Sequence, residues 1–191
     1  LSETQKEILN LENRIKEIRF PESYLNAIKL IYRMHKIDFP KLIAAIAVCF
    51  IASIIGHFFT VGSLGNWYAA LEKPFFTPPG WVFGVAWFAI YAMMGMAAYL
   101  VWERAYENKE AKFALALFGI LLGLNIGWSF IFFTMHNIFL ALIELIILWI
   151  AIAGTIIKFK EISVKASVLM LPYFIWVGFA VLLNYFMWIM N

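Results

Sequence analysis

The side chains of this sequence that could do chemistry are mostly aromatic. Among the 191 residues are 8 tryptophans, 19 phenylalanines and 8 tyrosines, and rings of this kind stack well on large, flat, apolar molecules. The sequence carries no nucleophile–base pair, phosphate-binding loop or zinc motif. Any reaction would therefore have to use the aromatic side chains and the bound molecule itself.

A few polar residues interrupt long apolar stretches. Glu144 is the only acid inside such a stretch, and we expect it to be protonated or hydrogen-bonded to Asn125 or Ser129, because a polar group in an apolar interior needs a partner. Asn125 and Asn184 could bond across helices or point into a cavity, and we favour the structural role for Asn125. The single cysteine, Cys49, lies in an apolar run and is expected to be a small buried residue.

Composition places these residues in a membrane. The chain is 64% hydrophobic and 14% charged, whereas soluble domains are about half apolar and about a quarter charged. Each of five apolar runs approaches the ~20 residues that span a bilayer as a helix. The runs are 41–61, 79–102, 112–133, 137–157 and 164–190. The sequence predicts an all-α fold, an integral membrane bundle of five transmembrane helices.

The first 39 residues differ from the rest. Apolar Ile8, Leu11, Ile15 and Ile18 recur at helical spacing between charged residues, which predicts a short amphipathic helix lying on a surface, with a coiled coil as the alternative. We therefore divide the chain into an amphipathic charged N-terminal extension, 1–39, and a five-helix membrane domain, 40–191. A partner helix, a surface anchor and an expression artefact all fit the extension.

Basic residues predict how the chain is oriented. With five spans, ten of them fall on the N-terminal side and only Lys73 falls on the other. Those ten are Lys29, Arg33, Lys36, Lys41, Arg104, Lys109, Lys112, Lys158, Lys160 and Lys165. The positive-inside rule then predicts a cytoplasmic N-terminus. Because the positive charge has this topological explanation, we expect membrane lipid as a partner and no nucleic acid.

The connection between the first two spans, 62–79, is rich in aromatic residues and proline. Pro74, Pro78 and Pro79 stiffen it, so it is not a flexible tether. Two interpretations stay open: an aromatic belt at the membrane surface, or a lid over a cavity in the bundle. The third and fourth spans are joined only by His136 and Asn137, which predicts that they are antiparallel neighbours.

The motifs around this connection resemble the TspO family, also called tryptophan-rich sensory proteins, translocator proteins or peripheral benzodiazepine receptors. The resemblance covers roughly residues 42–190 and follows the family's order. The matching residues are Trp67-Tyr68, Leu71, Lys73-Pro74, Thr77-Pro78-Pro79, Trp87, Tyr91, Gly95, Tyr99 to Trp102, Asn125, Trp128, Leu171 to Trp176, Leu183 to Tyr185, and Trp188.

The resemblance implies a five-helix bundle, usually a homodimer, with a cavity under the first loop that binds porphyrins such as protoporphyrin IX and haem. Porphyrin is then the ligand, and no cofactor is required. The residues expected to bind it are Trp67, Tyr68, Pro74, Phe76, Pro78, Phe83, Trp87, Tyr91, Asn125, Trp128, Leu140, Trp176 and Leu183. His57 could be an axial haem ligand, but with no second ligand at suitable spacing it is better explained as a satisfied histidine. We predict no metal site.

Three functions follow from these considerations. The favoured one is a membrane receptor or carrier for porphyrins and similar planar apolar ligands. An alternative is a photo-oxidative enzyme that degrades protoporphyrin IX with light and oxygen, because Trp87 and Trp176 stand where the resembled family carries the implicated pair. The other interpretation of Trp87 and Trp176 is two core tryptophans at helix contacts. The third is a transporter of small solutes or sterols.

The sequence weakens the third function. The spans hold one carboxylate and no basic residue well inside, which disfavours a water-filled path. The family's sterol pattern needs a basic residue after Tyr185, and none follows. For this reason we expect a prokaryotic cell membrane. Gly119, Gly123 and Gly127 form a small-residue face suited to packing on another helix of the bundle or on a dimer partner.

Overall fold

The computed structural model describes residues 6–7, 10, 37–105 and 108–191. Within them, five helices are long and apolar enough to cross a membrane, which confirms the predicted fold class. The elements are α3 (Phe39–Leu64), α4 (Trp67–Ala70), α5 (Gly80–Trp102), α6 (Lys109–Ser129), the π-helical segment η1 (Phe130–Thr134), α7 (Ile138–Ile162) and α8 (Val164–Met190). The amphipathic helix expected in the first 39 residues lies almost entirely outside the described residues.

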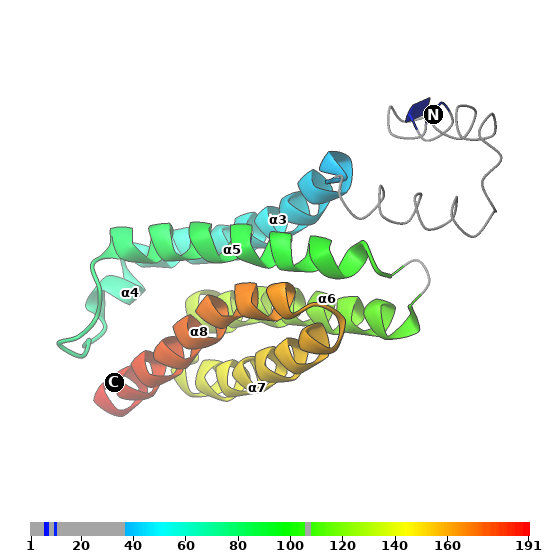
Figure 1. Ribbon diagram of the computed structural model, residues 1–191. Helices are drawn as coiled ribbons and strands as arrows, with labels where there is room; N and C mark the ends of the chain where they lie inside the picture. Colours follow the sequence, from blue (N-terminus) through cyan, green and yellow to red (C-terminus); the bar gives the residue numbers. More distant parts are fainter. Residues whose placement is uncertain (1–5, 8–9, 11–36, 106–107) are drawn as a thin grey trace. The chain divides into compact units, whose positions relative to one another are not determined.

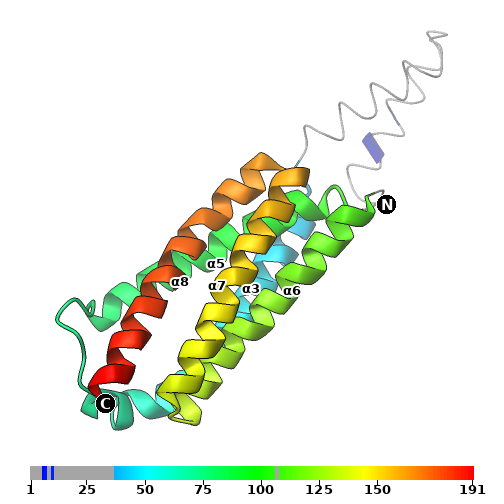
Figure 2. The ribbon, with the colours of Figure 1, turned by 90° about the horizontal axis from the view of Figure 1, so that it is seen from below.

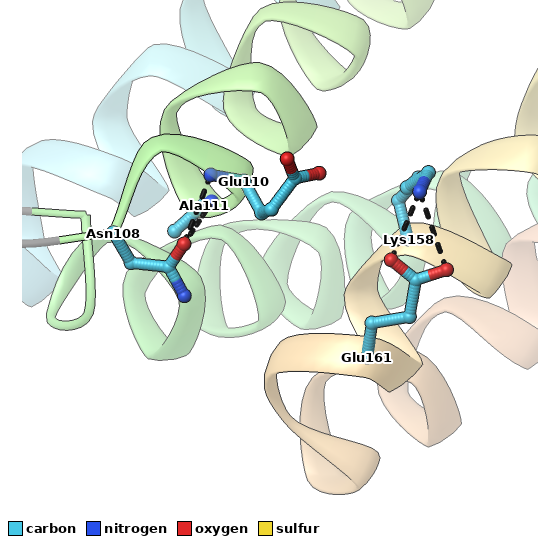
Figure 3. Close-up of polar contacts among 5 residues, drawn as sticks. All are labelled: Asn108, Glu110, Ala111, Lys158 and Glu161. Atoms are coloured by element: carbon cyan, nitrogen blue, oxygen red, sulfur yellow. Dashed lines mark hydrogen bonds and ion pairs between the residues drawn. The ribbon is translucent and has the colours of Figure 1, made fainter.

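The helices extend past the apolar runs at one end of the bundle because polar residues cap and brace them there. The Asn108 side chain accepts hydrogen bonds from the backbone N–H groups of Glu110 and Ala111, at 2.9 and 3.4 Å, and so starts α6 (Figure 3). Near the end of α7, the Lys158 ammonium lies 2.9 Å from the Glu161 carboxylate one turn later (Figure 3). We call the end of the bundle where α6 begins and α7 ends the basic end.

Four of the spans form the main core. Helix α5 packs against α6 and α8, and α7 packs against the same two helices (Figures 1 and 2). The α6–α7 contact confirms that the third and fourth spans are antiparallel neighbours. Phe118 of α6 stacks on Phe159 of α7 with ring centroids 5.9 Å apart, and both rings are buried. Aromatic packing of this kind holds the basic end of the core together.

Helix α3 is the least buried span, with 22% of its most apolar window buried against 33–44% for the others. Its contacts depend on small residues. A Cβ atom at Gly95 of α5 would lie 2.6 Å from the Cα atom of Ile46, so these two backbones touch. At Gly56 a Cβ atom would lie 3.3 Å from Ser129 Oγ of α6. Glycine thus lets α3 approach two neighbours closely.

At the other end of the bundle, α6 widens into a π-helical turn. The Met135 N–H donates to the Phe130 carbonyl five residues earlier, and the Asn137 N–H donates to the Ile131 carbonyl. In a regular α-helix, Asn137 would donate to Phe133 instead. The widened turn therefore leaves the Phe133 carbonyl without its usual backbone partner.

Gly95→Ala should weaken the attachment of α3, because the new methyl group would meet backbone that cannot move without shifting a helix. We expect a loss of roughly 1–3 kcal/mol in unfolding free energy. The buried Cys49, which is 0% exposed, provides the measurement: a thiol-reactive dye reports its exposure on heating in detergent. Gly84→Ala is the matched control on α5, since a Cβ atom there has no neighbour within 4 Å. Equal unfolding temperatures for the two variants would contradict the prediction.

Candidate functional site

The connection between α3 and α5 packs against the end of the bundle that carries η1. We call residues 66–79 the lid segment; it contains α4. The Trp67 ring stacks on the His136 ring at 4.3 Å and 18° and meets Phe132 edge-on at 5.3 Å. Tyr68 contacts Phe132 and Phe133 at 6.3 and 5.6 Å. The first aromatic pair of the lid segment thus rests directly on η1 and the turn after it.

Polar contacts hold the end of α3 to the same turn. The Ser63 hydroxyl donates to the Phe133 carbonyl that the π-helical turn leaves free, and its Oγ atom lies 3.2 Å from His136 Nε2. His136 has a φ of 56°, a left-handed conformation that reverses the chain in very few residues. The Asn137 side chain then accepts from the Leu140 N–H at 2.9 Å and caps α7.

The lid segment is also bonded to itself. The Lys73 ammonium donates to the carbonyls of Leu71 and Ala69, at 2.9 and 3.4 Å, and lies 4.8 Å from the centre of the Tyr68 ring. The Thr77 N–H and hydroxyl both donate to the Pro74 carbonyl, at 3.0 and 2.7 Å. Burial against the bundle raises the pKa of the Tyr68 hydroxyl above its ordinary value.

Beneath the lid segment the aromatic rings contact one another and form the lid cluster. Phe76 packs edge-on against Phe179 and Phe186 of α8, at 6.3 and 5.5 Å. Trp128 of α6 stacks on Phe132 at 5.2 Å. Members of the lid cluster are Trp67, Tyr68, Leu71, Phe76, Phe83, Trp128, Ile131, Phe132, Phe133, Ile138, Ala141, Phe179, Leu183 and Met187. In this closed arrangement the rings themselves occupy the space beneath the lid segment.

Trp87 and Trp176 lie on the facing sides of α5 and α8, next to the lid cluster. Trp87 lies 5.5 Å from Tyr91 and 6.2 Å from Tyr173, measured between ring centroids. Trp176 contacts Phe83 edge-on at 5.7 Å. Both indoles are half-buried, so each has one face in the core and one partly accessible.

Two asparagines satisfy polar groups across the helices. Asn125 accepts from the Tyr91 hydroxyl and donates to the Tyr173 hydroxyl at 3.1 Å, linking α6 to α5 and α8. Asn184 of α8 accepts from the Trp128 indole N–H at 3.3 Å and donates to the Ile138 carbonyl at 2.9 Å. The structural role expected for Asn125 therefore holds for both amides.

Glu144 of α7 was expected to be either protonated or hydrogen-bonded, and the structure bears on the second alternative. Neither of its carboxyl oxygens has a hydrogen-bond partner among the described residues, so the expected bond to Asn125 or Ser129 is absent. The residue is 9% exposed, and a Cβ atom at Gly127 of α6 would lie 3.9 Å from its Oε1 atom. The carboxyl group thus points at the glycine face of α6, while Asn125 uses its bonding capacity on the two tyrosines.

The residues expected to bind a ligand fall into three groups. Trp67, Tyr68, Phe76, Phe83, Trp128 and Leu183 meet in the lid cluster, and Trp87, Tyr91, Asn125 and Trp176 lie next to it. Pro74 and Pro78 belong to the lid segment and shape its backbone. Leu140 stands apart, 38% exposed on α7. His57 is also exposed, on α3.

Sequence reasoning missed several members of the site. Phe132 and Phe133 follow the tryptophan motif of α6 as an unremarkable aromatic pair, and His136 was considered only as a linker residue. A groove of about 260 Å³ was not expected either; it lies between α7 and α8 and is lined by apolar side chains around Trp149 and Gly178, with Tyr185 among them. The groove shares no residue with the lid cluster, although α7 and α8 contribute to both.

Comparison with known proteins shows a family to which most of the chain is similar. Residues 45–189 match the TspO/MBR family. The chain is 42% identical to the tryptophan-rich protein TspO of Archaeoglobus fulgidus over 151 residues, covering 79% of this chain and 97% of the relative. It is 34% identical to protein CrtK of Rhodobacter capsulatus, covering 76% of this chain and 91% of the relative. It is 37% identical to the human translocator protein, covering 73% of this chain and 81% of the relative.

Tyr173→Phe should destabilise the bundle, because the buried Asn125 amide would lose the oxygen that accepts its N–H. An unsatisfied buried donor costs about 1–3 kcal/mol, so the unfolding temperature in the Cys49 dye assay should fall by several degrees. Tyr185→Phe on the same helix is the control, since Tyr185 is 44% exposed. A Tyr173→Phe variant as stable as this control would show that Asn125 does not depend on the Tyr173 hydroxyl.

Glu144→Met should have the opposite effect and leave stability unchanged or raise it. Methionine keeps the length of the side chain and removes two buried oxygens that have no partner, a gain of about 1 kcal/mol. The comparison is Asn184→Leu, which removes an amide with two partners and should lower the unfolding temperature. If Glu144→Met is destabilised as much as Asn184→Leu, the carboxyl group has a bonded partner in the membrane.

Proposed function

The chain belongs to the TspO/MBR family, and from that membership and the geometry of the lid cluster we propose that it is a membrane receptor or carrier for porphyrins and similar planar apolar ligands. The ligand would lie between the lid segment and the bundle. The observation that supports this most is the concentration of rings from the lid segment, α5, α6 and α8 in one cluster. Aromatic rings that contact one another can exchange those contacts for contacts with a flat aromatic ligand.

Ligand entry would require the lid segment to lift. In the closed arrangement Phe76, Trp67 and Tyr68 already contact bundle rings, so a porphyrin must replace those contacts. The exchange conserves apolar burial, because ring-on-ring contacts become ring-on-ligand contacts. The lid segment can move as a body, since Lys73 and Thr77 bond it internally.

A second candidate function is light- and oxygen-dependent degradation of the bound porphyrin. The observation that favours it is the position of Trp87, half-buried and in ring contact with both Tyr91 and Tyr173. An oxidisable indole beside the ligand could exchange an electron with an excited porphyrin or trap singlet oxygen. Trp176, in contact with the lid-cluster ring of Phe83, would be its counterpart on α8.

We also propose a homodimer and a cytoplasmic basic end. The glycine face of α6 supports the dimer: at Gly119 and Gly123 a Cβ atom would have no neighbour within 4 Å, so no other described helix of the bundle packs there. Such a face suits a second copy in the membrane. The basic residues at the basic end support the orientation.

Titration with protoporphyrin IX tests the main proposal. Tryptophan fluorescence should be quenched at micromolar ligand in the dark, and Trp87→Phe or Trp176→Phe should lower the amplitude of the quenching, because each removes one of the indoles near the ligand. Trp102→Phe is the control, since that residue lies at the far end of α5 and is 40% exposed. Absence of quenching in the unaltered protein would overturn porphyrin binding.

Illumination of the same samples separates the two candidate functions. A new absorbing product that forms in air with the unaltered protein, and is lost in Trp87→Phe or Trp176→Phe but kept in Trp102→Phe, would favour the enzyme. Stable porphyrin absorption under light, with binding intact, would leave a receptor or carrier.

A further inference from the structure

The last residue of the sequence bonds to the lid segment across 119 positions. The Asn191 side chain accepts from the Glu72 N–H at 2.9 Å and donates to the Glu72 carbonyl at 3.0 Å. One side-chain amide therefore satisfies both backbone groups of a single lid residue, as a neighbouring strand would. Figures 1 and 2 both show the C-terminal end of α8 at the same end of the bundle as α4.

The Asn191 amide is itself held in place. Its backbone N–H donates to the Met187 carbonyl at 3.2 Å, and its side-chain Nδ2 donates to the same carbonyl at 2.9 Å. Met187 is buried at 2% exposure in the lid cluster. The Asn191 side chain is thus held by α8 on one side and by the backbone of Glu72 on the other.

Fixing Glu72 fixes the rest of the lid segment. Glu72 lies between Leu71, whose carbonyl accepts from Lys73, and the turn closed by Thr77 on Pro74. These bonds make the segment one body. The lid segment also contacts α8 through the ring of Phe76 and η1 through the rings of Trp67 and Tyr68, and a planar ligand can replace ring contacts of this kind. The Asn191 bonds have directional geometry, and an apolar ligand offers no substitute for them.

We propose that Asn191 is a latch: it holds the lid segment closed over the site and thereby sets the rate at which ligand enters and leaves. Asn191 bonds to the lid segment whether the site is free or occupied. It therefore controls the rates of ligand association and dissociation more than the affinity for the ligand. Asn191 is a positioning residue, acting through the backbone of Glu72. The identity of the ligand rests on the proposed function, whereas the latch itself does not.

Spin-label distances test the latch without ligand. Labels are placed at Phe75→Cys, a lid residue 99% exposed, and at Met135→Cys, 50% exposed beside η1, with Cys49→Ala to leave two thiols. The parent should give one main distance. Asn191→Leu, which loses both bonds, should raise the fraction with a longer distance about tenfold, and Asn191→Asp, which keeps only the acceptor for the Glu72 N–H, roughly threefold. Tyr185→Phe on the same helix is the control and should match the parent.

Stopped-flow mixing with protoporphyrin IX tests the consequence. In Asn191→Leu both association and dissociation should accelerate by similar factors, with the dissociation constant within about threefold of the unaltered protein. Unchanged distances in Asn191→Leu would overturn the latch whether or not porphyrin binds. Changed distances with unchanged exchange rates would overturn its control of exchange. Failure of the unaltered protein to bind porphyrin would overturn the proposed function, and the distance measurement would still decide the latch.

Discussion

The hydrocarbon interior of a bilayer offers no hydrogen-bond partner, and the protein must therefore satisfy every polar group from within. The structure meets this constraint with a small number of hydrogen bonds between helices. Asn125 serves two tyrosines on two other helices, and Asn184 serves an indole and a backbone carbonyl. The same requirement explains why the carbonyl released by the π-helical turn is taken up by Ser63 of α3. These bonds fix how the helices are rotated, which apolar packing alone specifies poorly.

One place does not meet the constraint. The buried Glu144 carboxyl has no partner among the described residues and points toward Gly127, at the end of an α6 face that is open at Gly119 and Gly123. The unpartnered carboxyl group of Glu144 and the uncovered glycine face of α6 thus lie next to each other. The buried amides of Asn125 and Asn184, by contrast, are paired across helices. The glycine face also differs from the lipid-facing surface of α3, because exposed apolar side chains such as Ile54 and Phe58 need no hydrogen-bond partner.

The sequence was sufficient for the spans, because the length and polarity of an apolar run decide whether it crosses a membrane. It also identified the aromatic loop, since proline and tryptophan in a connection are unusual. Trp67, Tyr68 and Phe76 of that loop belong to the lid cluster, and Phe83 and Trp128 were expected from the family resemblance. It could not show α4, the π-helical turn or the Asn191 contact. Helix α4 is four residues long, too short for a periodic pattern to reveal. The Asn191 contact joins residues 119 positions apart, and the π-helical turn is paired with a contact between Ser63 and Phe133, 70 positions apart. Leu140, also expected at the ligand site, lies 38% exposed on α7, and its role stays a prediction.

The π-helical turn has a consequence for how this sequence tolerates change. Such a turn accommodates one more residue than an α-helix would in the same length, so Phe130–Thr134 is sensitive to the number of residues as well as to their type. Deleting one residue there would let the backbone close to a regular helix, in which each N–H bonds to the carbonyl four residues earlier. The carbonyl that Ser63 now takes up would then be bonded within its own helix, and α3 would lose this contact. Length variation in this family should therefore be better tolerated almost anywhere outside the membrane than in these five residues.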